Sequence, residues 1–253
     1  MRRTLLLLTV ALAVLLVGWG LTNHVVKAEE PIAASGTAVS APSAGGTVAG
    51  TVTYLGAAPA PKKLQVTKDV AVCGQHDHFD ESLVVGANKG IKNVIVSIQS
   101  VKGGKSLDAL GTEFVLDQKG CSYQPHVLIV PVNKPLQIMN DDGILHNIHT
   151  FSTKNPPTNM PQPKFKKKME KVFTVAENVP VKCDVHGWMS GWIMVVDHPY
   201  HAVTDASGKF TLTDVPPGTY TVDFWQEALG SKTAQVTVAA GGTATLDFKY
   251  PAK

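Results

Sequence analysis

The sequence lacks long segments in which apolar residues recur three and four positions apart. With 22 glycines and 16 prolines as well, it excludes a fold made mainly of helices. It also lacks a Ser-His-Asp order, a phosphate-binding loop and a nucleotide fingerprint. We therefore expect a protein that is not an enzyme.

Net charge is also small. The chain has 23 basic and 20 acidic residues, a net charge of +3. Three of the basic residues, Arg2, Arg3 and Lys27, lie in residues 1–28, which hold no acidic residue. The remainder is neutral overall, so nothing in the charge indicates nucleic acid as a partner.

The N-terminus has the pattern of an export signal. Arg2 and Arg3 precede an apolar stretch over residues 5–17. We expect residues 1–28 to be a secretory signal peptide. An uncleaved membrane anchor is the alternative, because residues 4–22 are about long enough to span a bilayer. Both place the protein in the periplasm or the extracellular space, with membrane contact only through an uncleaved N-terminus.

Short alternating segments predict an all-β chain. Residues 29–46 are rich in Ala, Ser, Gly and Pro and should form a flexible linker. Apolar and polar residues then alternate over residues 48–54. Further strands of a sandwich or barrel are expected between turn signals, over residues 94–101, 114–116, 127–132, 136–139, 172–175, 179–183 and 192–196.

The chain changes character near residue 198. Turn signals at residues 205–208 and 216–218 separate strands with regular alternation. We therefore expect two domains, one over residues 47–198 and a small β-sandwich over residues 199–253. The second is short for an independent sandwich and should pack on the first.

Three cysteines are an odd number for an exported protein. Cys73 and Cys121 lie beside glycines, and an oxidising compartment favours a disulfide between them. A second metal site, formed by the same cysteines with nearby histidines, is the alternative. Cys183 is left unpaired, and metal ligation would protect its thiol.

The most informative segment is Cys183-x-x-His186-x-x-Met189. It places a thiol, an imidazole and a thioether at intervals of three residues. A second imidazole, His146, lies upstream. Two His, one Cys and one weak Met are the ligands of a mononuclear type 1 copper site, which carries single electrons.

These motifs resemble those of cupredoxins of the plastocyanin, amicyanin and azurin type. His146-Asn147, preceded by Asn140-Asp141-Asp142, is similar to the first-ligand segment of plastocyanin-like domains, and the cysteine segment is similar to the short amicyanin-like ligand loop. The resemblance covers about residues 124–197 and implies a Greek-key sandwich or barrel. It implies that Asn147 braces the cysteine loop, and that one copper ion is bound by His146, Cys183, His186 and Met189.

His149 is a rival ligand, three residues after His146. Residues an odd number of positions apart in a strand point to opposite faces, so only one of the two can easily face Cys183. We favour His146 because it carries the family-like context.

The C-terminal segment resembles a second family. Residues 199–248 are similar to carboxypeptidase regulatory-like (transthyretin-like) β-sandwich modules, which are usually accessory. Residues 46–54 also resemble the first strand of such modules, so the two domains could share or exchange strands.

Five lysines cluster before the strand expected at residues 172–175. One interpretation is a docking patch for an acidic redox partner protein. The other is a solvated edge that lysines protect from aggregation. The residues are Lys164, Lys166, Lys167, Lys168 and Lys171.

Together these features predict an exported copper protein that carries single electrons. One alternative is a non-redox envelope or carbohydrate-binding module. Another is a periplasmic protein for copper delivery or storage, which would use the same ligands.

Overall fold

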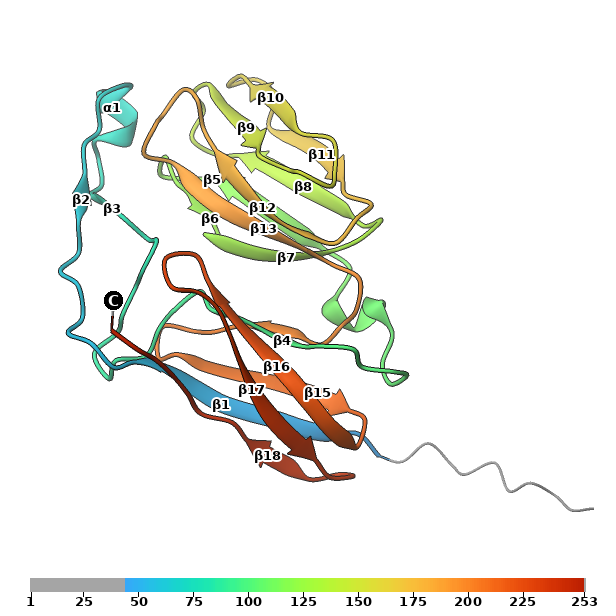
Figure 1. Ribbon diagram of the computed structural model, residues 1–253. Coiled ribbons are helices and arrows are strands. Elements are labelled where there is room, and N and C mark those ends of the chain that lie inside the picture. The colour runs from blue at the N-terminus through green and yellow to red at the C-terminus, as the bar shows by residue number, and fades with distance from the viewer. Residues whose placement is uncertain (1–43, 253) are drawn as a thin grey trace, which may run out of the picture. The chain divides into compact units, whose positions relative to one another are not determined.

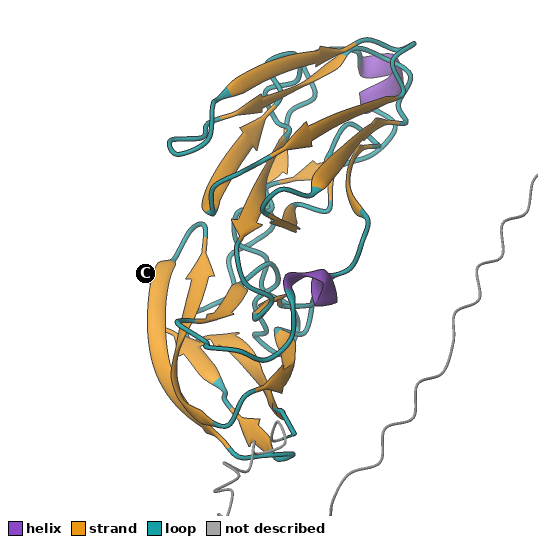
Figure 2. Ribbon diagram, turned by 90° about the vertical axis from the view of Figure 1, so that its right-hand side faces the viewer, coloured by secondary structure: helices purple, strands orange, loops and turns teal. Residues whose placement is uncertain are grey.

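The computed structural model describes residues 44–252, and strands are nearly their only regular structure (Figure 2). Two short helical turns, α1 (Val70–Cys73) and η1 (Leu107–Leu110), interrupt them. The prediction of an all-β chain is confirmed. The expected signal peptide, residues 1–28, and most of the expected linker lie outside the described residues. Within the described range, no helix is long and apolar enough to cross a membrane.

One sandwich, which we call the terminal sandwich, combines strands from both ends of the described chain. In Figure 1 the blue strand β1 lies among the orange and red strands of the C-terminal segment. One sheet has the order β15-β1-β18, with β19 also paired to β1, and the other has the order β14-β4-β16-β17. The strands are β1 (Gly46–Tyr54), β4 (Ile95–Ile98), β14 (His201–Val203), β15 (Lys209–Val215), β16 (Gly218–Gln226), β17 (Gly230–Val238), β18 (Thr243–Thr245) and β19 (Phe248–Tyr250).

Strand β1 forms because its sequence alternates and because it contains a glycine at its closest contact. Val48 and Val52 are fully buried in the core of the terminal sandwich. A Cβ on Gly50 would lie 1.9 Å from the backbone oxygen of Leu246. Only glycine therefore allows the C-terminal segment to run this close to β1.

A second sandwich, which we call the inserted sandwich, lies in sequence between β4 and β14. Its sheets have the orders β10-β9-β12-β13-β7 and β11-β8-β5-β6. They enclose a separate apolar core that includes Leu116, Ile138, Ile148 and Ile193. The strands are β5 (Phe114–Gln118), β6 (Tyr123–Gln124), β7 (Val127–Pro131), β8 (Pro135–Asn140), β9 (His146–Thr150), β10 (Thr158–Gln162), β11 (Lys168–Val172), β12 (Glu177–Lys182) and β13 (Ser190–Val196). Among the described residues, no sheet closes into a barrel.

The boundary expected between residues 198 and 199 does not separate the sheets of the two sandwiches. Strands β1 and β4 come from the range 47–198 but pair with strands of the C-terminal segment. Between β1 and β4 the chain also forms a short excursion with β2 (Lys63–Leu64), α1 and β3 (His78–Phe79). A division into two domains over residues 47–198 and 199–253 stays a prediction.

One expected strand is wrong. Residues 173–175 lie outside any strand, because the preceding strand β11 covers Lys168–Val172 instead. Val172 and Val175 are both exposed, and only Phe173 between them lies in the core.

Candidate metal centre

Two neighbouring strands bring three of the four predicted ligands together. His146 is the first residue of β9, and Cys183 directly follows β12, which pairs with β9. The Nδ1 atoms of His146 and His186 lie 2.9 Å apart, and the Cys183 Sγ lies 3.8 Å from the His186 Nδ1. One donor atom from each of the three residues lies within 4.8 Å of the other two. Both imidazoles are 0% exposed and Cys183 is 2% exposed, so the cluster is closed to bulk water.

Backbone hydrogen bonds close the ligand loop between β12 and β13. The Cys183 N–H donates to the Met189 carbonyl (3.1 Å), and the Met189 N–H donates to the His186 carbonyl (2.9 Å). Asn147 Oδ1 accepts hydrogen bonds from the Asp184 N–H (2.8 Å) and from the Cys183 thiol (3.2 Å). Asn147 therefore ties β9 to the start of the loop.

His149 lies apart from this cluster. Its Nδ1 lies 3.0 Å from the Asp184 carboxylate, and its side chain is partly exposed. His146, three residues earlier on β9, is buried. The two side chains thus point to opposite faces of the strand, as the period of two requires.

Carboxylates hold the far nitrogen of each buried imidazole. The His146 Nε2 lies 2.9 Å from Asp142 Oδ2, and the His186 Nε2 lies 2.8 Å from Asp69 Oδ2. A carboxylate can only accept, so each Nε2–H is the donor. The sequence offered a weak signal for Asp142, four residues before His146, and none for Asp69, 117 residues before His186.

The surroundings favour the metal-binding forms of Cys183 and His186, whereas the pKa of His146 is raised, because the lowering effect of burial is outweighed by hydrogen bonds with Asp142 and Cys183. Burial alone would raise the pKa of Cys183, but hydrogen bonds with His146 and with the backbone near Asn147 and His186 lower it. Burial also lowers the pKa of His186, despite the opposing effect of Asp69. A thiolate and a neutral imidazole are the forms that bind a metal ion.

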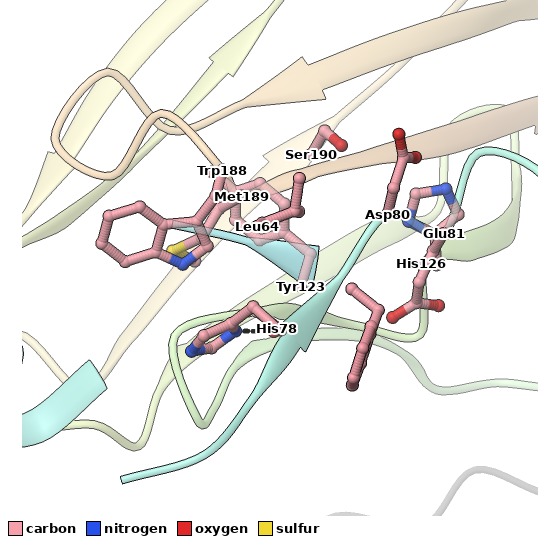
Figure 3. Close-up of a pocket in the computed structure, with 11 residues that line it drawn as sticks. Leu64, His78, Asp80, Glu81, Tyr123, His126, Trp188, Met189 and Ser190 are labelled. Carbon is pink, nitrogen blue, oxygen red and sulfur yellow. Dashed lines mark hydrogen bonds between the residues drawn. The ribbon is translucent and has the colours of Figure 1, made fainter. Parts of the chain in front are cut away.

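Met189 is buried at the end of the loop, at 2% exposure. Figure 3 shows its side chain beside Trp188, in the wall of a pocket that also includes His78, Tyr123 and His126. The Trp188 ring centroid lies 5.1 Å from that of His186. Trp188 thus places an aromatic ring next to His186, and the buried Met189 belongs to the same apolar core as Cys183.

The other two cysteines form a disulfide. The bond joins Cys73 to Cys121, as predicted, and leaves Cys183 as the free cysteine. A second group with metal-like spacing consists of Cys121, Asp142 and His146. Its sulfur is in the disulfide and cannot act as a thiolate, so the alternative of a second metal site at these cysteines is not supported.

Four of the five clustered lysines are exposed. Lys171 instead lies half-buried with its Nζ 4.9 Å from the centroid of the Phe173 ring. Lys164 and the exposed Phe165 line a hollow that also includes Leu145 and Val185, which directly adjoin His146 and His186 in sequence. The exposed residues of the cluster are Lys164, Lys166, Lys167 and Lys168.

The donor set fits copper. A thiolate is a soft ligand that suits Cu(I), imidazole suits Cu(II), and a thioether serves both as a weak ligand. His146, Cys183 and His186 converge in a dry site, and their orientation is fixed by Asn147 and by the two carboxylates.

Comparison with protein families identifies one β module. The model of the carboxypeptidase regulatory-like domain matches residues 193–251, in agreement with the predicted C-terminal module. No curated protein matches the chain.

Solved structures with similar segments include copper proteins. A Cu-containing nitrite reductase from Thermus scotoductus SA-01 is 22% identical over 34% of this chain and 22% of that chain, with a TM-score of 0.31. A purple cupredoxin from Nitrosopumilus maritimus is 22% identical over 33% of this chain and 100% of that chain, with a TM-score of 0.29. A methionine-to-alanine mutant of amicyanin in its Cu(I) form is 19% identical over 40% of this chain and 98% of that chain, with a TM-score of 0.31.

These matches include the family that the ligand motifs resemble. The chain spans about a fifth of the nitrite reductase. At such TM-scores the matches carry no weight for function, which has to be inferred from the residues of this chain.

Proposed function

We propose that this protein binds one copper ion at a type 1 site and carries single electrons. The proposal depends on one observation, the convergence of the two Nδ1 atoms and the Cys183 sulfur in a buried cluster. His146, Cys183 and His186 would hold the ion, with Met189 as a weak fourth ligand. Asn147 would brace the loop that carries three of the four ligands.

Bound copper would supply a one-electron couple between Cu(I) and Cu(II). The protein contributes rigidity, because hydrogen bonds fix both imidazoles and the ligand loop. It also excludes water from the three donors, all of which are buried. Both properties favour electron transfer with little rearrangement.

Burial of the donors favours an electron carrier over a copper delivery or storage protein. A delivery protein must exchange its ion with a partner's ligands, and none of the three buried donors is accessible for such exchange. A carrier should therefore retain its copper against a chelator. No contact among the described residues specifically favours a carbohydrate-binding role.

An exported location is part of the proposal. The N-terminal pattern of residues 1–28 supports it, and so does the disulfide between Cys73 and Cys121, since disulfides persist in oxidising compartments. An acidic redox partner docking near Lys164 and Phe165 is also proposed, because their hollow reaches residues that adjoin both imidazole ligands.

The test is to load the purified protein with Cu(II) and record its visible spectrum. We expect a strong thiolate-to-copper band at one copper per chain. The band should disappear in Cys183→Ala and in His146→Ala. It should persist in the matched control His149→Ala, which removes an imidazole from the opposite face of the same strand.

A colourless stoichiometric complex, or a band that survives Cys183→Ala, would contradict the proposal. Circular dichroism of each variant separates loss of the site from loss of the fold. Retention of copper during prolonged incubation with a chelator distinguishes the carrier from a delivery protein, which should release it.

A further inference from the structure

Each imidazole of the candidate copper site is held by its own carboxylate, and the two carboxylates come from separate segments. Asp142 precedes β9, whereas Asp69 lies in the excursion between β1 and β4. Both accept from an Nε2–H, which leaves both Nδ1 atoms directed toward the Cys183 thiol and each other. The rings therefore present to one point the nitrogen that a metal ion needs.

The Asp142 carboxylate is held in place by backbone hydrogen bonds that are independent of the imidazole. Its Oδ1 accepts from the Gly120 N–H (2.6 Å), and its Oδ2 accepts from the Cys121 N–H (2.8 Å). Its side chain is only 7% exposed. Two backbone donors on one rigid loop thus set the direction in which the carboxylate faces His146.

The conformation of Asp69 is not explained by interactions with its own helix α1. It directly precedes α1, a position where an Asp side chain commonly caps the helix, yet it makes no such hydrogen bond. Its backbone is left-handed, with a φ of 49°, a conformation that few residues other than glycine adopt. The carboxylate is directed at His186 instead, so the observed outlier points to a role at the site.

A disulfide and a hydrogen bond together connect the two segments. Cys73, at the end of α1, is bonded to Cys121, whose N–H donates to Asp142. The Cys121 carbonyl in turn accepts from the Trp188 indole N–H (3.1 Å). The segments that carry Asp69 and Asp142 are thereby joined to each other and to the ligand loop.

We propose that Asp69 and Asp142 are positioning residues that orient the two imidazoles and favour Cu(II) over Cu(I) through their negative charge. This rests on the proposed copper site. Carboxylates that hold metal-bound imidazoles typically change metal affinity 10- to 100-fold when removed. Because Cu(II) carries the larger charge, removing either carboxylate should also raise the reduction potential.

Asp69→Asn separates charge from orientation, because the amide oxygen still accepts from the His186 Nε2–H. We expect it to bind copper roughly 10- to 100-fold more weakly in chelator competition, with the visible band retained and the potential raised. Asp142→Asn should change both quantities in the same direction. Asp77→Asn is the matched control, since Asp77 lies in the same excursion but is exposed and paired with Lys63. It should leave both quantities unchanged.

A second measurement needs no copper. In the metal-free protein, the buried Nε2–H groups of His146 and His186 should give slowly exchanging downfield proton NMR signals. The His186 signal should disappear in Asp69→Ala and persist in Asp69→Asn and Asp77→Asn.

If the wild type shows no thiolate-to-copper band, the copper proposal fails, and this measurement alone decides whether the carboxylates orient the rings. The inference is overturned if the His186 signal survives in Asp69→Ala, or if affinity and potential in both Asp→Asn variants match Asp77→Asn.

Discussion

At the scale of single residues, Glu177 holds together the loop that follows β9. Its carboxylate accepts from the N–H and hydroxyl groups of Thr153, the Lys154 N–H, and the N–H and side-chain amide of Asn155. Asn155 then accepts from the backbone N–H groups of Thr174 and Val175. One acidic side chain at the start of β12 thus orders two connections of the inserted sandwich.

This arrangement predicts a stability that depends on pH. Burial alone would raise the pKa of Glu177, but the hydrogen bonds from Thr153, Asn155 and Lys154 lower it to about 2, from an ordinary value of 4.5. Because the pKa is lower in the folded protein, the stabilisation is complete above pH 4.5 and is lost as the pH falls toward 2. Glu177→Gln should lower the free energy of unfolding at pH 7 by about 2 kcal/mol.

Urea unfolding at a series of pH values measures this effect. The difference between wild type and Glu177→Gln should shrink as the pH falls from 4.5 toward 2. Glu170→Gln is the control, because Glu170 is an exposed partner of Lys168 and should contribute under about 1 kcal/mol. An equal effect of the two substitutions, or a difference that does not change with pH, would contradict the prediction.

Local spacing made the donor cluster predictable. Cys183 and His186 lie three residues apart, so a tight loop brings them together. Only one donor of the cluster, His146, comes from a distant part of the sequence. The carboxylate on His186 could not be predicted, because Asp69 is 117 residues away and sequence gives no measure of such a distance.

At the scale of elements, the segment between β10 and β11 combines exposed lysines with an exposed aromatic residue. Phe165 is 81% exposed and lies between Lys164 and Lys166. Positive charge near the candidate copper site should attract anionic reactants. The double variant Lys164→Glu/Lys166→Glu should therefore slow oxidation of the reduced protein by ferricyanide roughly threefold or more at low salt.

The same charge change on the terminal sandwich provides the control. Lys232→Glu/Lys249→Glu alters exposed lysines on β17 and β19 and should have a smaller effect. Both effects should fade as salt screens the charges. Equal slowing by the two double variants would show that only net charge matters and would remove the support for a docking site at this segment.

Strands with regular alternation were predicted well, and polar strands were not. The strand expected at residues 48–54 corresponds to β1, in which Val48 and Val52 face the core. Strand β9, His146–Thr150, was expected only as an extended segment around His146 and His149, because its buried face includes a histidine and a threonine. Strand β11 was missed because lysines occupy its exposed positions. Polar side chains that serve a binding site or protect a sheet edge therefore obscure the alternation by which a strand is predicted.

At the scale of the whole molecule, the terminal sandwich requires strands from both ends of the described chain. Val48 and Val52 of β1, and Val96 and Ile98 of β4, are fully buried in its core. Burying each such side chain contributes about 1.5–3 kcal/mol, so losing all four would remove an amount comparable with the whole stability of a domain. A fragment of residues 199–253 should therefore not fold.

Far-UV circular dichroism and a proton–nitrogen NMR correlation spectrum of that fragment test this expectation. We expect narrow amide dispersion and no cooperative unfolding, whereas the full chain should give both wide dispersion and a cooperative transition. A fragment with a dispersed spectrum would show that the C-terminal segment folds without β1 and β4. The resemblance of residues 46–54 to the first strand of such modules hinted at shared strands, but alternation alone does not identify a strand's partners.

The pairing of β1 with the last strands also bears on how the chain is made. Val52 pairs with Phe248, roughly 200 residues later. A ribosome adding about 5–20 residues per second needs roughly 10 to 40 s between them. During that interval β1 lacks its pairing with β18 and β19, while all the strands of the inserted sandwich have already been synthesised. The inserted sandwich, with the candidate metal centre, can thus be complete before the strand that was synthesised first has all its partners.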